Sequence, residues 1–187
     1  MTPRRAIALA DGASGSAEAV AALAASRGWP LIDDTPRGHH EPRTLVWAVD
    51  PSTSVGYVEA HQLGTRHLEL TGPDPVALAD LDAWLRARVA HHDEGALLAS
   101  AAGAGPVELL RALPVLASFH PAVESDAYLA VFRRALDHDH LAVRRFAAIT
   151  AAARCADGSW PRLRALVAER QRVEPDPALA ALLGGLG

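Results

Sequence analysis

Lysine is absent from this chain, and cysteine and aromatic residues are scarce. All 18 basic residues are arginines, and the only cysteine is Cys155. A single cysteine excludes a disulfide framework within the chain and a zinc site built on several cysteines. Cys155 falls in a helical pattern rich in small residues, where a buried, inert thiol is the expected state.

Long hydrophobic runs are also missing. No stretch approaches the roughly 20 apolar residues that a membrane span requires. The apolar run after Arg4 and Arg5 is too short for the core of a signal peptide. We therefore expect a cytoplasmic protein with no membrane association. Half of the 187 residues are hydrophobic, which is enough to build one domain or two small ones.

Charge divides unevenly along the chain, whose formal net charge is −4. Residues 1–95 hold 8 arginines against 13 acidic residues, a formal charge of −5, and residues 96–187 hold 10 against 9, a formal charge of +1. An acidic first half disfavours general affinity for nucleic acid or for anionic membranes.

The first half has the pattern of a small α/β module, predicted to span residues 1–92. Apolar and β-branched runs predict strands, and alanine-rich or amphipathic segments predict helices. The polar segment 33–43 is predicted to be an exposed loop. The predicted strands are 6–10, 29–32, 44–49, 55–63 and 66–70, and the predicted helices are 16–26 and 76–90.

The second half, residues 93–187, is predicted to be helical throughout. The segment 137–140 (Asp-His-Asp-His) interrupts two apolar stripes of helical period, one ending at Leu136 and one beginning at Val143. Two such helices cannot bury both stripes alone, so neighbouring hairpins must stack. Pro114 is predicted to break or kink its helix. The predicted helices are 95–104, 106–119, 124–136, 141–156, 160–173 and 177–186.

The hairpin joint resembles a HEAT repeat, with an Asp in the turn followed by Val-Arg and small residues that open the second helix. The resemblance covers roughly residues 95–187 and implies two or three stacked units. It also implies a ladder between adjacent repeats, formed by Asp139 (or Asp137) and Arg144.

One strand carries a candidate acid–base pair. Tyr57, Glu59 and His61 share one strand face by the period of two, and a carboxylate near an imidazole on an open face suits proton transfer. No nucleophile or orienting third group accompanies them, so a half-solvated face that binds a partner is the favoured interpretation. A small enzyme with its site where sheet and helices meet, using Glu59, His61 or His67, is the alternative.

Two further motifs have an ordinary structural interpretation. The segment 11–16 (Asp-Gly-Ala-Ser-Gly-Ser) lies between a predicted strand and a helix, where glycine amides can bind phosphate, yet the same residues form ordinary turns and caps. The nine histidines lack a zinc-binding spacing. We therefore predict no metal and no cofactor.

The helical half is locally rich in arginine. Arg133, Arg134, Arg144 and Arg145 are candidate binding residues, and HEAT-like proteins include DNA glycosylases that use such a surface against phosphates. The nearly balanced charge of this half makes nucleic-acid binding the weaker alternative.

Together these patterns predict an α+β protein, a small α/β sheet module followed by a short HEAT-like right-handed α-solenoid of helical hairpins. The expected function is non-catalytic, a protein–protein interaction or adaptor module. The partner would be another protein, such as an antitoxin-like or immunity partner, or a second copy paired edge to edge into a dimer.

Overall fold

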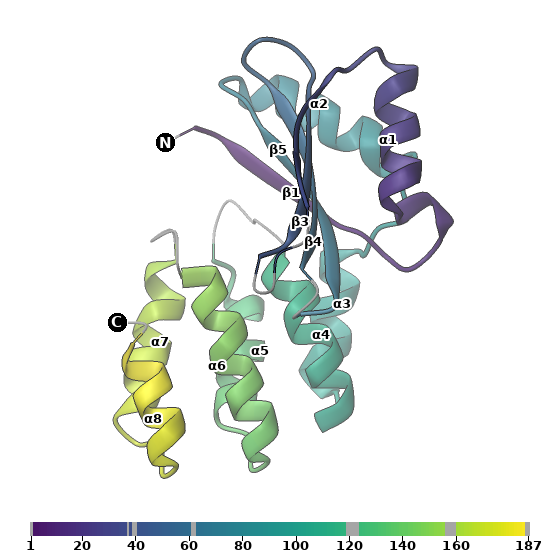
Figure 1. Cartoon of the computed structure of the whole chain (residues 1–187). Coiled ribbons are helices and arrows are strands. Elements are labelled where there is room, and N and C mark those ends of the chain that lie inside the picture. The colour runs from purple at the N-terminus through teal and green to yellow at the C-terminus, as the bar shows by residue number, and fades with distance from the viewer. Residues whose placement is uncertain are drawn as a thin grey trace. The chain divides into compact units, whose positions relative to one another are not determined.

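The computed structural model of the chain describes residues 2–36, 38, 41–60, 63–118, 124–155 and 160–185. It has the predicted α+β architecture, with an antiparallel sheet in the first half and helical pairs after it (Figure 1). The chain divides into two compact units, Met1–Asp93 with Ser118–Pro121 and Glu94–Ala117 with Ala122–Gly187. We call them the sheet unit and the helical unit and describe each by itself.

Five strands form the sheet, in the order β1-β5-β4-β3-β2 with every neighbouring pair antiparallel. Strands β2 to β5 therefore form a meander, and β1 adds at the far edge beside β5. Short turns that reverse the chain explain this order, because antiparallel neighbours need only a tight connection. The strands are β1 (Arg4–Ala8), β2 (Leu31–Thr35), β3 (Arg43–Ala48), β4 (Ser54–Ala60) and β5 (Thr65–Thr71).

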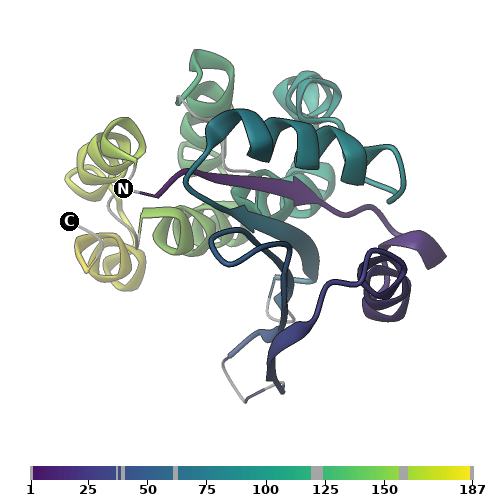
Figure 2. The same cartoon turned by 90° about the horizontal axis from the view of Figure 1, so that it is seen from above.

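Two helices, α1 (Ala17–Ser26) and α2 (Pro75–Arg86), pack on one side of this sheet (Figure 2). Each begins at a capping side chain: Ser16 Oγ accepts from the Ala19 amide at 3.2 Å, and Asp74 Oδ1 accepts from the Val76 amide at 2.8 Å. Each fully buried leucine of the core contributes roughly 1.5–3 kcal/mol of hydrophobic stabilisation. The core includes Ile7, Val20, Leu45, Trp47, Val55, Tyr57, Leu68, Leu70, Leu78 and Leu85.

Differences from the predicted elements are small and local in the sheet unit. Helix α1 ends before Gly28, whose φ of 68° lies in the left-handed region that glycine adopts without strain. Strand β2 continues to Thr35, so the predicted loop at 33–43 begins later than expected. The polar composition of Asp33 and Asp34 suggests a loop, but backbone pairing with β3 holds both residues in the strand.

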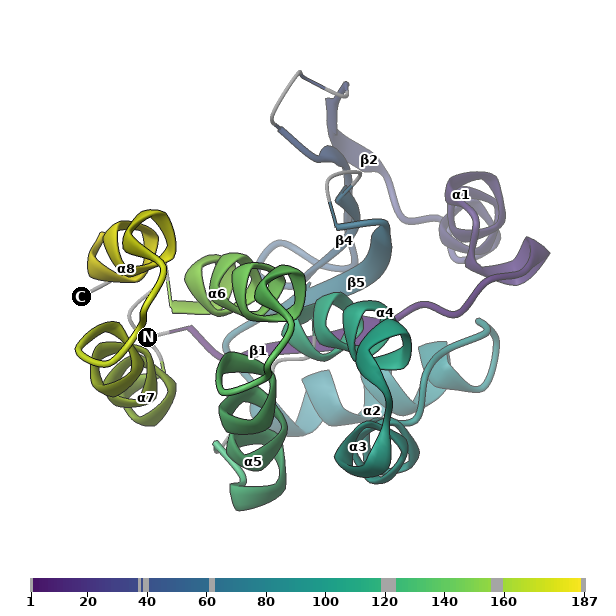
Figure 3. The ribbon, with the colours of Figure 1, turned by 90° about the horizontal axis from the view of Figure 1, so that it is seen from below.

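The helical unit is a two-layer stack of helical pairs. Figure 3 shows α3, α5 and α7 in one row and α4, α6 and α8 in the other. We call these the odd layer and the even layer; α5 contacts both α3 and α7, and α6 contacts α8. The helices are α3 (Glu94–Gly103), α4 (Pro106–Ser118), α5 (Asp126–Leu136), α6 (Leu141–Cys155), α7 (Pro161–Gln171) and α8 (Pro177–Gly184).

Small and apolar side chains at helical spacing account for this stack. Tyr128 and Phe132 of α5 stack with ring centroids 5.0 Å apart, and Tyr128 also packs against Trp160, which precedes α7, at 4.9 Å. Helix α4 continues across Pro114 to Ser118. Among the described residues, no helix is both long enough and apolar enough to cross a membrane.

Candidate functional site

The strand face predicted to carry Tyr57, Glu59 and His61 is not the open face of the sheet. Tyr57 is only 1% exposed and belongs to the hydrophobic core, on the side that α1 and α2 cover. Glu59 is half-buried at the same side, and His61 lies outside the described residues. The sequence predicts that Tyr57, Glu59 and His61 share a half-solvated face. This prediction is wrong for Tyr57, because its side chain points to the side of β4 that the helices cover.

Glu59 instead belongs to a row of charged residues across three strands. The register places it opposite Arg43 of β3 and opposite Arg66 of β5. Arg66 Nη2 donates to Asp11 Oδ1 at 2.7 Å, although the Asp11 side chain itself is fully exposed. Arginine and glutamate in cross-strand positions attract one another. The row therefore forms a polar boundary where the covered core ends.

Tyr57 is unsuited to act as a base in this setting. Burial raises the pKa of its hydroxyl group, and the nearby Glu59 carboxylate raises it further, against the opposing effect of Arg66. The phenol consequently stays protonated at neutral pH. Because Tyr57 is buried and uncharged, packing is its evident role.

The serines of segment 11–16 are engaged in structural hydrogen bonds. Ser14 Oγ accepts from the Ala90 amide at 3.1 Å, and Ser16 Oγ caps α1. Gly12 has a φ of 146°, and a short 3-10 helix (Ala13–Gly15) follows it. These contacts correspond to the turn-and-cap interpretation of the segment, with the first turn of α1 already capped by its own chain.

Arg144 lies at the centre of a hydrogen-bonded cluster between two hairpin joints. Its Nε and Nη2 donate to the two carboxylate oxygens of Glu174 at 3.2 and 3.1 Å, and its Nη1 donates to the main-chain carbonyls of His138 and Asp139. The Glu174 side chain is fully buried and that of Arg144 is 10% exposed. Arg170 donates to the same carboxylate at 3.0 Å.

The carboxylate partner of Arg144 is therefore Glu174, and the predicted side-chain pairing with Asp139 is corrected. Asp139 contributes its main-chain carbonyl, and Asp137 pairs with Arg170 at 3.4 Å. Burial acts to raise the pKa of the Glu174 carboxyl, but hydrogen bonds from Arg144, the Asp176 amide and Arg170 outweigh it and lower the pKa overall. Reasoning from the sequence missed Glu174 because it lies in the next joint.

Arg134 has a comparable structural role in the preceding hairpin. Its Nη1 donates to the Ala101 carbonyl at 2.8 Å, and its Nη2 donates to the Ala104 carbonyl. These carbonyl groups belong to the last turn of α3 and to the residue after it, and the Ala101 carbonyl also accepts from the Ala104 amide at 3.3 Å. Arg134 is therefore hydrogen-bonded to the end of α3, and its role as a binding residue stays a prediction.

Arg133 and Arg145 are the exposed members of the four candidate arginines. Arg133 lies 3.4 Å from Glu169, and Arg145 lies 3.4 Å from Asp176. Both pairs are largely exposed and join adjacent hairpins at the surface. Their positive charge is thus locally offset by an acidic neighbour, which weakens the attraction that a phosphate backbone requires.

Histidine and cysteine form no metal-binding cluster in the described residues, and the predicted candidate His67 is buried with its Nε2 3.3 Å from Glu69 Oε1. No group of three or more His, Cys, Asp or Glu side chains is arranged there to hold a metal ion. His138 Nδ1 accepts from the His140 amide at 3.0 Å, as expected for capping at the joint. Cys155 is buried, and burial raises the pKa of its thiol, which reduces the thiolate fraction.

The two layers of the helical unit differ in the surface they expose. Each helix of the even layer exposes one large aliphatic side chain: Val107 of α4 is 53% exposed, Ile149 of α6 is 45% exposed and Leu182 of α8 is 38% exposed. Within α3, α5 and α7 the large hydrophobic side chains are buried or half-buried, and Val173, two residues after α7, is 66% exposed. We call Val107, Ile149 and Leu182 the even-layer aliphatics.

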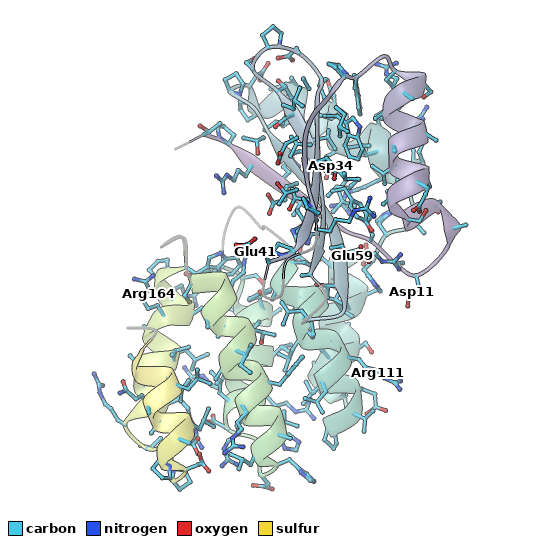
Figure 4. All side chains as sticks on the ribbon, viewed as in Figure 1. Asp11, Asp34, Glu41, Glu59, Arg111 and Arg164 are labelled. Atoms are coloured by element: carbon cyan, nitrogen blue, oxygen red, sulfur yellow. The ribbon has the colours of Figure 1, made fainter. Side chains whose placement is uncertain are left out.

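Ion pairs join neighbouring hairpins in both layers, and on the even layer Arg145 of α6 pairs with Asp176 at the start of α8. Arg133 of α5 pairs with Glu169 of α7, and Arg162 of α7 pairs with Asp126 of α5 at 2.6 Å. On the even layer, Arg111 extends from α4 into solvent (Figure 4). The even layer thus differs from the odd layer in the large aliphatic side chains that its helices expose.

Comparison with protein-family models, curated proteins and solved structures gives no match to this chain. The class of the protein therefore rests on its architecture: an α+β chain with a five-stranded antiparallel sheet unit and a two-layer unit of paired helices.

Proposed function

We propose that this chain is a non-catalytic adaptor that acts in the cytoplasm and binds another protein through the even layer of a HEAT-like helical unit. The observation that carries this proposal is the exposure of one aliphatic side chain on each of α4, α6 and α8. Exposing three such side chains on one layer costs hydrophobic free energy, which contact with a partner would recover.

The distribution of charge supports the same choice of surface. On the odd layer, the exposed pairs Arg133–Glu169 and Arg162–Asp126 join neighbouring hairpins and offset one another within the chain. On the even layer, α8 carries no charged residue between Pro177 and Gly184. Surfaces without charged side chains, such as that of α8, are typical of the core of a protein–protein interface.

The hydrogen-bonded cluster at the joints explains how this surface would be kept in shape. Arg134 and Arg144 each tie one hairpin to its neighbour through buried or half-buried hydrogen bonds. A stack held at its joints presents the even layer as a rigid array, and rigidity reduces the entropic cost of binding.

Site-specific photo-crosslinking in the native host tests the proposal. A photoreactive residue at Ile149 or at Leu182 is expected to capture the same protein, whereas one at the exposed Ala130 of α5 is not. The double substitution Ile149→Glu with Leu182→Glu should weaken that complex at least about tenfold, because buried carboxylates would replace aliphatic contacts.

A matched pair of substitutions provides the control. Ala130→Glu with Ala165→Glu adds the same charge to exposed positions of the odd layer and should leave the complex intact. Far-UV circular dichroism establishes that both double variants keep their helices. Capture from Ala130, or a complex that survives Ile149→Glu with Leu182→Glu in a folded variant, would refute the assignment of the even layer.

A further inference from the structure

Strand β2 is an edge of the sheet with unusual exposure. It pairs only with β3, and four of its five residues are exposed. Leu31 is 50% exposed and Ile32 is 60% exposed. An edge strand directs alternate main-chain N–H and C=O groups away from its neighbour, where they can pair with an added strand.

The chemistry of the edge changes along its length. Two aliphatic side chains are followed by two acids, Asp33 and Asp34, and Figure 4 shows Asp34 on this strand. Thr35 Oγ1 donates to Asp33 Oδ2 at 3.1 Å. Within the described part of the chain, neither acid forms an ion pair with an arginine or histidine. The edge therefore carries two negative charges that no basic side chain in those residues offsets.

A second copy of this chain is a poor occupant for that edge. In a symmetric antiparallel pair of β2 strands, a strand centred on Asp33 would place Asp33 of one copy opposite Asp33 of the other. Like charges directly opposite one another destabilise a strand pair. The acids thus oppose the edge-to-edge dimer that a bare edge would otherwise favour.

We propose that the β2 edge accepts an extended basic segment of a partner protein by strand addition. Arginine or lysine side chains of the segment would face Asp33 and Asp34, and its aliphatic side chains would cover Leu31 and Ile32. Main-chain hydrogen bonds give affinity in this mode of recognition, and alternate side chains give specificity.

The irregular pairing between Leu31 and Asp33 limits the length of the added strand. The register of β2 on β3 shifts at this point, as at a β-bulge. A bulge twists the edge and disrupts regular pairing. The regular segment of the edge is therefore Asp33–Thr35, so main-chain pairing with the added strand runs along the two acids, and Leu31 and Ile32 contribute side-chain contacts beside it. This inference does not depend on the even layer of the helical unit, because it concerns a different surface.

Titration with designed peptides tests the proposal, using two end-blocked peptides of equal length. One carries two adjacent arginines between valines, so that their side chains point to opposite faces as those of Asp33 and Asp34 do, and the other carries two adjacent glutamates at the same places. With isotope-labelled full-length protein, the arginine peptide should shift the amide resonances of residues 31–35 and bind at least about tenfold more tightly than the glutamate peptide. The preference should shrink at high salt, since exposed charges are screened.

Charge reversal at two places distinguishes recognition by the β2 edge from a general attraction of basic peptides to the acidic sheet unit. Asp33→Arg with Asp34→Arg should invert the preference between the two peptides, whereas Asp80→Arg, at an exposed acid of α2, should leave the preference in place. Ile32→Ser, which keeps both acids, should weaken both peptides. The number and dispersion of amide resonances report whether each variant is folded.

Three results would overturn the proposal. The first is equal affinity for the two peptides, and the second is a set of shifted resonances that excludes residues 31–35. The third is a concentration-dependent dimer in which the amides of β2 are protected from exchange, since a second copy would then be the occupant. Each of these results leaves the crosslinking test of Ile149 and Leu182 unaffected.

Discussion

Arg144 and Arg145 are adjacent in sequence and have opposite surroundings. Arg144 is buried against Glu174 and two main-chain carbonyls, whereas the Arg145 side chain is 50% exposed beside Asp176. Removing one member of a buried pair leaves the other charge without its compensation, but exposed pairs are screened by solvent. The two arginines should therefore differ greatly in their contribution to stability.

We predict that Arg144→Ala lowers the free energy of unfolding by about 3 kcal/mol. The loss stays at the lower end of the range for buried pairs because Arg170 still donates to Glu174. Arg145→Ala should cost less than about 1 kcal/mol. Urea unfolding followed by far-UV circular dichroism measures both values, and equal losses would contradict the assignment of Arg144 to the cluster.

Glu174 makes stability depend on pH. Its carboxyl has a lowered pKa in the folded protein, so its contribution is complete above the ordinary glutamate value of roughly 4.3 and disappears as pH falls through the lower folded value. We predict that Glu174→Gln is less stable than the parent at about pH 7 and that the difference narrows toward about pH 3. Urea unfolding at each pH measures this difference in the free energy of unfolding. A difference that stays constant between the two pH values would show that ionisation of Glu174 does not contribute to stability.

At the scale of the element, α7 begins on a cap supplied by another hairpin. Trp160 at its N-cap position offers no capping side chain. Glu124, which precedes α5, accepts instead from the amides of Arg162 and Leu163 at 2.8 and 2.7 Å. Glu124 is 8% exposed, so these bonds form away from water and satisfy two amides that the helix itself leaves open.

We predict that Glu124→Ala destabilises the helical unit by about 1–2 kcal/mol, the usual effect of losing a helix cap. Asp126→Ala is the matched control, because the Asp126 side chain is 90% exposed and, among the described residues, bonds to the flexible end of Arg162. That control should change the urea midpoint little. A Glu124→Ala midpoint no lower than that of Asp126→Ala would show that the amides of α7 do not need this carboxylate.

At the scale of the whole molecule, apolar periodicity predicts where the helices and strands lie, but it does not predict which residues of distant elements contact one another. Stripes such as the one on α5, with Tyr128 and Phe132 buried, establish where the helices lie. They also imply stacking, because a hairpin with two apolar faces needs neighbours. The α+β class follows from the same reasoning applied to the strands of the first half.

The candidate sites were harder to predict because they depend on pairing between distant segments. A period of two places Tyr57 and Glu59 on the same strand face, but it does not say which face the helices cover. The bond from Arg144 to Glu174 spans 30 residues, and the spacing within a single hairpin contains no information about the next joint. Exposure of Val107, Ile149 and Leu182 likewise depends on how the hairpins stack.

The cap on α7 also has a consequence for biosynthesis. A ribosome makes the chain from its N-terminus, so the carboxylate that receives the first amides of α7 emerges 38 residues before Arg162 does. The last hairpin can then dock on a surface that is already assembled when its own residues leave the exit tunnel. We therefore expect the hairpin of α7 and α8 to dock after the hairpin of α5 and α6 has emerged.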